Sequence, residues 1–239
     1  MLVLDMSEYQ GEASVNRLIG APPGYIGYDE GGQLTDFVRE TPYTVVLFDE
    51  VEKAHSRVFD VLLQVLEEGR LTDSQGRVAT FGETVIIMTS NLGSDHMRVP
   101  VIGEVERQRV LAEVNRFFRP EFLNRLDEII LFHQLANDQL AQILEFMLKK
   151  EMSLAGNQGI KLTLTPAAKT WLLAQNDQPE YGARPLRRII ARHLREPLAD
   201  FLLNEGGNPT HDKTTLVTVD AGESGLDFDI ENKRRKGTN

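Results

Sequence analysis

Two short apolar runs, each followed at once by polar side chains, constrain the fold of this chain most. Residues 44–48 (TVVLF) run directly into Asp49 and Glu50, and residues 84–88 (TVIIM) run into small polar residues that end at Asn91. Apolar runs of this length are typical of strands buried on both faces of a sheet. We therefore expect two strands whose ends bring polar groups to one edge of the same sheet.

The segments around these runs indicate an α/β fold. Apolar residues at helical spacing predict a helix with Ser56 as N-cap and Gly69 as its C-terminal stop. Residues 70–82 are polar and are expected to form a loop, whereas residues 2–5 and 128–132 are expected to be further strands. Strands that alternate with helices imply a largely parallel sheet flanked by helices.

A smaller α+β domain is expected after this sheet. We place the first domain at residues 1–135, the second at 136–231 and a charged tail at 232–239. The second domain is predicted to open with a helix capped by Asn137 and to contain a strand at 160–164, followed by further helices and strands. A length of 239 residues is sufficient for two compact units.

Composition excludes several classes of function. The 36 acidic and 26 basic residues give a net charge of -10, which repels phosphate backbones, so nucleic acid is not an expected partner. The absence of cysteine excludes disulfides, thiolate metal sites and cysteine nucleophiles. No apolar stretch approaches the roughly 18 residues needed to span a bilayer, and the N-terminus does not resemble a signal peptide. We expect a cytoplasmic protein without a membrane partner.

Five polar side chains are candidates for phosphate chemistry. Asp49 could hold Mg²⁺ or its waters, Glu50 could polarise an attacking water, and Asn91 could orient that water. Arg125 and Arg184 lie in turn-like segments from which a guanidinium could reach a phosphate. The competing interpretations are that the acids only cap the next helix, that Asn91 is a turn residue and that each arginine forms a surface salt bridge.

The order of six short motifs carries a resemblance to a known family. The chain resembles the second AAA+ module of ClpB-type Clp chaperones over roughly residues 1–220, with a P-loop NTPase-like sheet that is incomplete at its N-terminus and is followed by the small domain of that family. The matching motifs are Gly24-Tyr25-Ile26-Gly27, residues 45–50 (VVLFDE), 69–73 (GRLTD), 89–93 (TSNLG), 118–125 (FRPEFLNR) and 182–185 (GARP).

The resemblance implies ATP and Mg²⁺ as cofactors and assigns a role to each candidate residue. Asp49 matches the Walker B metal-site acid, Glu50 the catalytic glutamate and Asn91 the sensor 1 residue. Arg184 matches sensor 2. Arg125 matches the arginine finger that reaches the ATP of a neighbouring subunit, so the resemblance also implies self-association or assembly with full-length Clp subunits in a hexameric ring.

A loop rich in Gly and Pro matches the pore loop of the family. The resemblance implies that Tyr25, with Gly24, Ile26 and Gly27, grips an unfolded or aggregated polypeptide in the central channel. An aromatic ring suits this task because it contacts any extended chain through area rather than through a particular sequence. The competing interpretation is a buried tyrosine that closes a Gly/Pro turn.

One departure from the family pattern concerns the phosphate loop. In the family this Gly-rich segment with its Lys and Ser/Thr precedes the position of Leu2, and no such segment occurs in the 239 residues. The strand that feeds this loop is central in the family's sheet, so its loss would leave two strands without a partner. We expect weak or no ATP binding by the chain alone, as for a fragment, a truncated product or a half completed by another chain.

Three functional hypotheses follow. The leading hypothesis is an ATP-driven unfolding or disaggregation module, and the alternative is a non-hydrolysing subunit that lends Arg125 and its small domain to full-length partners. An AAA+ protein acting on DNA is disfavoured by the acidic charge. The segment 94–104 is short and has Glu104 where an apolar anchor would be needed, so a ClpP-type peptidase is not an expected partner.

Overall fold

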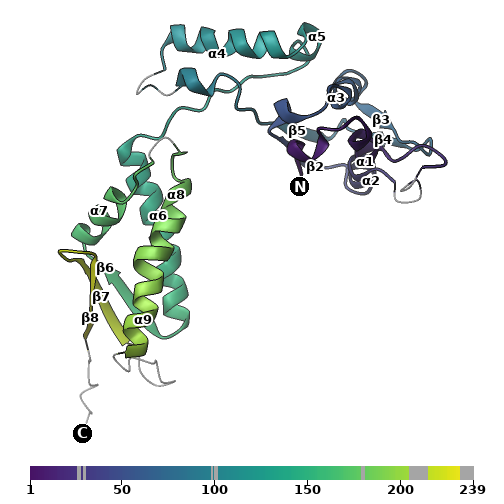
Figure 1. Cartoon of the computed structure of the whole chain (residues 1–239). Coiled ribbons are helices and arrows are strands. Elements are labelled where there is room, and N and C mark those ends of the chain that lie inside the picture. Colours follow the sequence, from purple (N-terminus) through teal and green to yellow (C-terminus); the bar gives the residue numbers. More distant parts are fainter. Residues whose placement is uncertain are drawn as a thin grey trace. The chain divides into compact units, whose positions relative to one another are not determined.

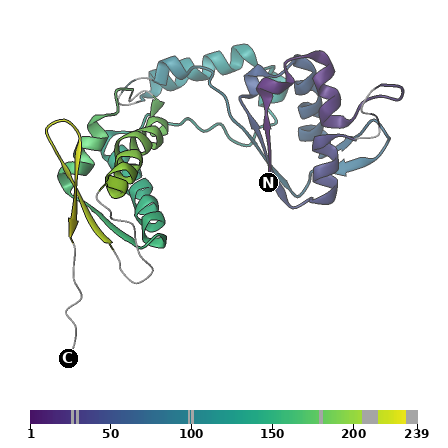
Figure 2. The same cartoon turned by 60° about the horizontal axis from the view of Figure 1, so that its bottom comes forward.

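The computed structural model divides the chain into two compact units, residues 1–133 and 134–239 (Figures 1 and 2). None of the helices that it describes is long and apolar enough to cross a membrane. The structure describes residues 1–25, 28, 31–97, 99, 102–178, 181–204 and 215–231. Ile26, Gly27 and the expected tail at 232–239 lie outside these residues.

A parallel sheet organises the first unit. Its strands are β1 (Leu2–Asp5), β2 (Thr44–Asp49) and β5 (Thr84–Met88), in the order β1-β2-β5. Both pairings are parallel, so all three strands end at the same edge. The expectation of an α/β fold with a parallel sheet is confirmed.

Only one face of this sheet is fully buried. Leu4, Val46 and Phe48 are buried in the core of the first unit, together with apolar residues of the surrounding helices. On β5, by contrast, Val85 is 57% exposed and Ile87 is 46% exposed. The prediction that β5 is buried on both faces is therefore wrong, because alternate side chains of a strand point to opposite faces and only one face of β5 is covered.

Residues 128–132 do not form the expected strand. They have no regular secondary structure, and Ile130 and Phe132 are exposed. A strand needs a partner for its main-chain N–H and C=O groups. No strand of the described residues pairs with this segment, and β2 is the only such strand that pairs with β5. The apolar pattern alone therefore led to a wrong prediction.

Residues 70–82 form a hairpin rather than the expected loop. Strands β3 (Arg70–Thr72) and β4 (Val78–Thr80) pair antiparallel, and Leu71 lies opposite Ala79. Both side chains are buried in the core of the first unit. Each strand is three residues long with a single buried side chain, which is too short to produce a visible apolar run.

Helix α3 shows how the sequence sets helix ends. Its N-cap is His55, whose Nδ1 accepts the N–H of Arg57 at 3.3 Å, and not Ser56 as predicted. Gly69 ends the helix with φ +63°, which confirms it as the stop. The helices of the first unit are α1 (Val15–Ile19), α2 (Gln33–Glu40), α3 (Ser56–Glu68), α4 (Glu104–Phe117) and α5 (Pro120–Leu123).

The second unit is an α+β domain with a core of its own. In its sheet β6 pairs parallel with β7, and β7 pairs antiparallel with β8. Figure 1 shows α6 and α9 running beside this sheet. The elements are α6 (Asn137–Asn157), β6 (Ile160–Leu164), α7 (Pro166–Ala174), α8 (Arg184–Ile190), α9 (Glu196–Asn204), β7 (Thr215–Ala221) and β8 (Leu226–Glu231).

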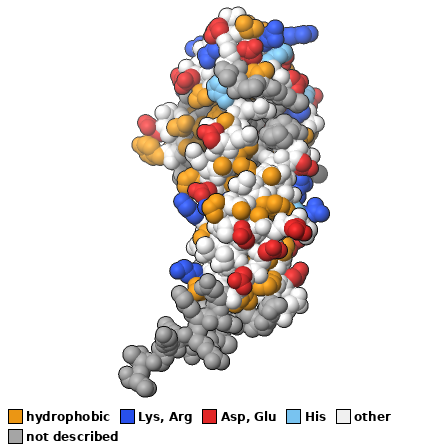
Figure 3. Space-filling view, turned by 90° about the vertical axis from the view of Figure 1, so that its left-hand side faces the viewer, with side chains coloured by type: hydrophobic (Ala, Val, Ile, Leu, Met, Phe, Trp, Pro, Cys, Tyr) orange, Lys and Arg blue, Asp and Glu red, His pale blue; other side chains and the backbone are white. Residues whose placement is uncertain are grey.

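Two local details of this unit differ from simple helix rules. Helix α6 is preceded by Ala136 as N-cap rather than by the predicted Asn137. Pro197 does not end the last helix. A π-helical turn at Ala191–Arg195 joins α8 to α9 and changes the main-chain hydrogen-bond pattern just before Pro197, which has no N–H to donate. Figure 3 faces the side on which α7 and β8 lie, where apolar and charged side chains are interspersed.

Candidate functional site

The polar residues predicted at the strand ends are brought together in the first unit. Glu50 Oε1 accepts a hydrogen bond from Asn91 Nδ2 at 3.1 Å, which joins the residues after β2 to those after β5. Asp49 is exposed and its Oδ1 accepts a hydrogen bond from Thr89 Oγ1 at 2.5 Å. Two carboxylates and one amide therefore share the edge at which the strands end.

Two further residues complete this cluster and were missed from the sequence. Thr89 Oγ1 accepts the main-chain N–H of Glu50 at 3.0 Å, so one hydroxyl connects both acids. Glu52 Oε1 accepts the main-chain N–H of Asn91 at 3.2 Å. Thr89 directly follows Met88, the last residue of β5 that pairs with β2, and this register places it beside Asp49.

The backbone at Glu50 is strained. Glu50 has φ +54° and ψ +51°, and it is the only non-glycine residue with positive φ in the described part of the chain. Such a conformation costs on the order of 1–2 kcal/mol for an L-residue. Main-chain hydrogen bonds from Thr89 N to Phe48 O at 3.0 Å and from Val51 N to Thr89 O at 2.9 Å hold the segment in place.

The donor set suits Mg²⁺ bound together with phosphate. The described residues contain no group of three or more His, Asp or Glu side chains arranged to hold a metal, so this part of the chain offers no complete protein cage. Mg²⁺ prefers oxygen ligands and commonly keeps several waters besides one or two carboxylates and substrate phosphates. The exposed carboxylate of Asp49 fits that mode of binding.

Arg125 pairs with a residue of α3 and not with the strand-end cluster. It follows α5, and its Nη2 and Nε donate to Glu67 Oε1 on α3 at 3.1 and 3.2 Å. The two side chains are 50% and 41% exposed. None of the hydrogen bonds among the described residues joins Arg125 to Asp49, Glu50 or Asn91, so these residues do not form one cluster within a single chain.

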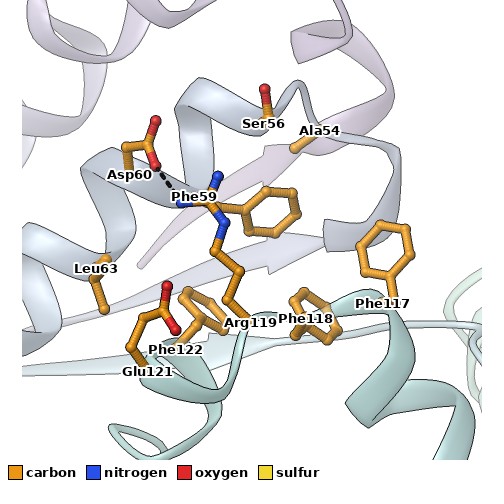
Figure 4. Close-up of a pocket in the computed structure, with 10 residues that line it drawn as sticks. All are labelled: Ala54, Ser56, Phe59, Asp60, Leu63, Phe117, Phe118, Arg119, Glu121 and Phe122. Carbon is orange, nitrogen blue, oxygen red and sulfur yellow. Dashed lines mark hydrogen bonds and ion pairs between the residues drawn. The ribbon is translucent and has the colours of Figure 1, made fainter.

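Aromatic side chains fasten the segment that presents Arg125 (Figure 4). Phe59 of α3 makes edge-to-face contacts with Phe118 at 5.5 Å and Phe122 at 5.7 Å between ring centroids. These side chains line a cavity of about 230 Å³. Arg119 and Asp60 also line it, and Arg119 Nη1 donates to Asp60 Oδ1 at 3.4 Å. The turn between α4 and α5 is thereby held against α3.

The remaining predicted residues lie elsewhere. Tyr25 and Gly24 are in the loop between α1 and α2, and the Tyr25 side chain is 67% exposed, which contradicts the interpretation of a buried turn tyrosine. The predicted loop residues Ile26 and Gly27 lie outside the described residues. Arg184 is the exposed first residue of α8 in the second unit, and its side chain has no hydrogen bond or ion pair within the described ranges.

Family models match both units of the chain. The family model described as AAA domain (Cdc48 subfamily) matches residues 1–129, and the model described as the C-terminal, D2-small domain of ClpB protein matches residues 135–216. The chain belongs to the AAA domain family, on its ClpB-type branch, which confirms the resemblance of the motifs.

The curated relatives are chaperones. The chain is 56% identical over 210 residues to Chaperone protein ClpB 2 of Thermosynechococcus vestitus, covering 86% of this chain and 24% of the relative. It is 50% identical over 230 residues to Chaperone protein ClpB 1 of Nostoc sp., covering 94% and 26%. It is 48% identical to Chaperone protein ClpB of Rhizobium meliloti, covering 100% and 27%. The chain thus spans about a quarter of the length of these relatives.

Proposed function

We propose that this chain supplies the ATP-hydrolysing and polypeptide-gripping parts of a ClpB-type unfolding or disaggregating chaperone. The observation that carries the proposal is the contact of 3.1 Å between Glu50 Oε1 and Asn91 Nδ2 at the edge where two parallel strands end. A carboxylate next to an amide can orient a water for attack on a phosphoryl group.

In this mechanism ATP bound with Mg²⁺ supplies the phosphoryl group that is transferred to water. Asp49 would hold the metal through its free oxygen or through waters. Glu50 would accept a proton from the attacking water, and Asn91 would fix the position of that water. Thr89 would keep both acids oriented, because it bonds the Asp49 carboxylate and the Glu50 main chain. Arg184 would act as a further phosphate contact.

Arg125 is proposed to act on the nucleotide of a neighbouring subunit. Among the described residues Arg125 makes no hydrogen bond to the cluster around Glu50, and its exposed pairing with Glu67 supports a role in trans. The site would then be completed only in a ring, for which a hexamer is the expected form. Arg125→Ala, mixed into rings of a full-length ClpB relative, should slow hydrolysis at neighbouring sites, whereas Arg57→Ala, at another exposed arginine, should not.

Tyr25 is proposed to contact unfolded or aggregated polypeptide substrates. The test uses a chimera in which residues 1–239 replace the matching quarter of a full-length ClpB relative. Tyr25→Ala should abolish unfolding of a fluorescent substrate protein while ATP turnover persists. Tyr43→Ala is the matched control, because Tyr43 is also an exposed tyrosine of the first unit. Unfolding that survives Tyr25→Ala would contradict the proposal.

The second candidate function is a subunit that does not hydrolyse ATP itself. The observation that favours it is the exposure of Arg125, because an exposed arginine could reach a neighbouring subunit even if this chain binds no nucleotide itself. Under this candidate, the purified 239-residue chain would show no ATP turnover yet would change the rate of a full-length partner in an Arg125-dependent manner. Turnover that Glu50→Gln removes would favour the hydrolytic function instead.

A further inference from the structure

We propose that Asp73 is a positioning residue for Tyr25. A cluster of ion pairs centred on Asp73, at the turn of the β3–β4 hairpin, fixes the base of the loop that carries Tyr25. The cluster thereby couples this loop to the body of the first unit. The inference rests on the proposed role of Tyr25 in contacting a polypeptide. The Asp73 cluster would restrain the loop so that Tyr25 keeps its position during this contact.

The Tyr25 loop is closed at its base. A Cβ atom built on Gly20 would lie 3.4 Å from the carbonyl carbon of Gly31 and 3.5 Å from the nitrogen of Gly32, so the two ends of the loop lie side by side. Gly20 and Gly31 have φ of +91° and +72°, a region that side chains rarely adopt. The loop therefore leaves and re-enters the first unit at one point, with Tyr25 exposed between its ends.

The hairpin turn holds both ends of this loop. Ser74 N donates to Ile19 O at 2.9 Å on the entering side. Gln75 Nε2 donates to Tyr28 O at 2.8 Å on the returning side. Two consecutive residues of one turn thus bridge segments that flank Tyr25. Figures 1 and 2 show the hairpin on the same side of the first unit as this loop.

Asp73 organises the turn that makes these contacts. Its side chain is 1% exposed, and its Oδ1 accepts the main-chain N–H groups of Gln75 at 2.9 Å and Arg77 at 2.8 Å. Arg77 Nε donates to Asp73 Oδ2 at 2.7 Å. Burial raises the pKa of Asp73, but the hydrogen bonds and charge of Arg77, with the N–H of Gln75, outweigh burial and lower it below its usual value. Asp73 is therefore a carboxylate at neutral pH.

The same cluster reaches the helix that follows the loop. Arg77 Nη2 donates to Asp36 Oδ1 at 2.9 Å, and Arg39 bonds Asp36 at 2.5 Å and Asp73 at 3.4 Å. Asp36 and Arg39 belong to α2, which starts at Gln33, directly after the loop. Two acids and two bases therefore join the hairpin turn to α2 through shared, partly buried ion pairs.

This arrangement has a mechanical consequence. A loop that pulls on a polypeptide must pass force to the body of its domain, and a base held on both sides by one rigid turn can do so. The hydrogen bonds that Asp73 makes within the described ranges do not involve Asp49, Glu50 or Asn91. Loss of the Asp73 carboxylate should therefore weaken the grip of Tyr25 and leave ATP turnover in place.

The first arm of the test measures the loop in the 239-residue chain. The chain has no cysteine, so Tyr25→Cys provides a single site for a nitroxide spin label. Asp73→Asn should sharpen the spectrum of this label, which reports faster local motion. Asp60→Asn is the matched control, because Asp60 belongs to an exposed ion pair of the same unit, and it should leave the spectrum unchanged.

A second variant guards against loss of folding. If circular dichroism shows that Asp73→Asn does not fold, Arg77→Lys carries the test, because it keeps the positive charge but removes the fork that joins Asp73 to Asp36. A spectrum at position 25 that is unchanged in a folded Asp73→Asn or Arg77→Lys variant would overturn the inference.

The second arm measures the consequence for unfolding in the chimera. Asp73→Asn should slow substrate unfolding about fivefold, within the range of mutations that alter coupling between sites, while ATP turnover stays within about twofold of the unmodified chimera. If Tyr25→Ala abolishes unfolding but Asp73→Asn leaves it unchanged, the positioning role of Asp73 is wrong. If Tyr25→Ala leaves unfolding intact, the proposed function itself fails.

Discussion

Replacing Phe122 with alanine should destabilise the first unit and leave the second unit unchanged. Phe122 is 4% exposed, stacks on Phe118 at 5.3 Å and meets Phe59 edge-on at 5.7 Å. Phe122 lies in the segment that presents Arg125. The hydrophobic core that contains Phe122 is separate from the core of the second unit. The substitution therefore tests both the anchoring of that segment and the independence of the two units.

The magnitude follows from burial and from the neighbouring cavity. Removing a buried phenylalanine side chain costs about 3–5 kcal/mol. Because Phe122 already lines a cavity of about 230 Å³, we expect the lower end of that range, about 3 kcal/mol. With a urea dependence of about 2 kcal/mol per molar, the midpoint of the first unit should fall by about 1.5 M. Phe122→Leu should cost less than Phe122→Ala, because it removes fewer buried atoms.

The position of the only tryptophan makes the assay selective. Trp171 lies in the second unit, edge-on to His193 at 5.3 Å, so its fluorescence reports unfolding of that unit alone. Far-ultraviolet circular dichroism reports both units. Phe122→Ala should move the dichroism transition to lower urea and leave the fluorescence transition in place. Leu148→Ala, in the buried core of the second unit, should move the fluorescence transition instead.

A shared transition would refute this reasoning. If Phe122→Ala shifts the tryptophan fluorescence as far as the dichroism, the two units unfold as one cooperative body. If Phe122→Ala shifts neither signal, the aromatic cluster does not hold the turn between α4 and α5 against α3.

Three further experiments test local features. An added Cβ atom would meet no other atom within 4 Å at either Gly69 or Gly156. Gly69→Ala should nevertheless lower the unfolding free energy by about 1 kcal/mol because the φ of Gly69 is +63°, whereas Gly156→Ala should raise it by about 0.5 kcal/mol. Urea titration measures both changes. The pKa of Asp73 is lowered in the folded state, so its carboxylate stabilises the fold at pH values above the usual pKa of 3.8. This stabilisation should be lost as the pH falls through the lower pKa of the folded state. Acid titration of the Asp73→Asn variant should lack this loss. Glu67→Gln should change stability by less than about 1 kcal/mol because its pair with Arg125 is exposed, and thermal unfolding measures this.

The strand-end cluster was accessible from the sequence because it depends on short apolar runs and the residues that follow them. Two parallel strands with those runs must end side by side, so the order of residues along the chain is enough to place Asp49, Glu50 and Asn91 together. The role of Thr89 depends on the register of one residue across the sheet, and the left-handed backbone of Glu50 depends on tertiary hydrogen bonds. Neither has a signature in residue type alone.

The errors of prediction come from elements that depend on partners. Residues 128–132 have the composition of a strand, but strand formation needs a neighbour that composition does not reveal. The β3–β4 hairpin went unpredicted because its stability comes from the Asp73 turn and from one buried side chain in each strand. The partner of Arg125, Glu67 on α3, is far away in sequence and lies in an ordinary exposed helix position.

The central claim is that the cluster around Glu50 hydrolyses ATP, and the most direct test is the rate of ATP hydrolysis by the chimera. The other AAA module of the full-length relative is first inactivated, so that only this site contributes. Glu50→Gln should lower the rate by about 100-fold or more, the size expected when a general base is lost. Glu68→Gln, at an exposed position of α3, should leave the rate unchanged. An undiminished rate in the Glu50→Gln chimera would contradict the account.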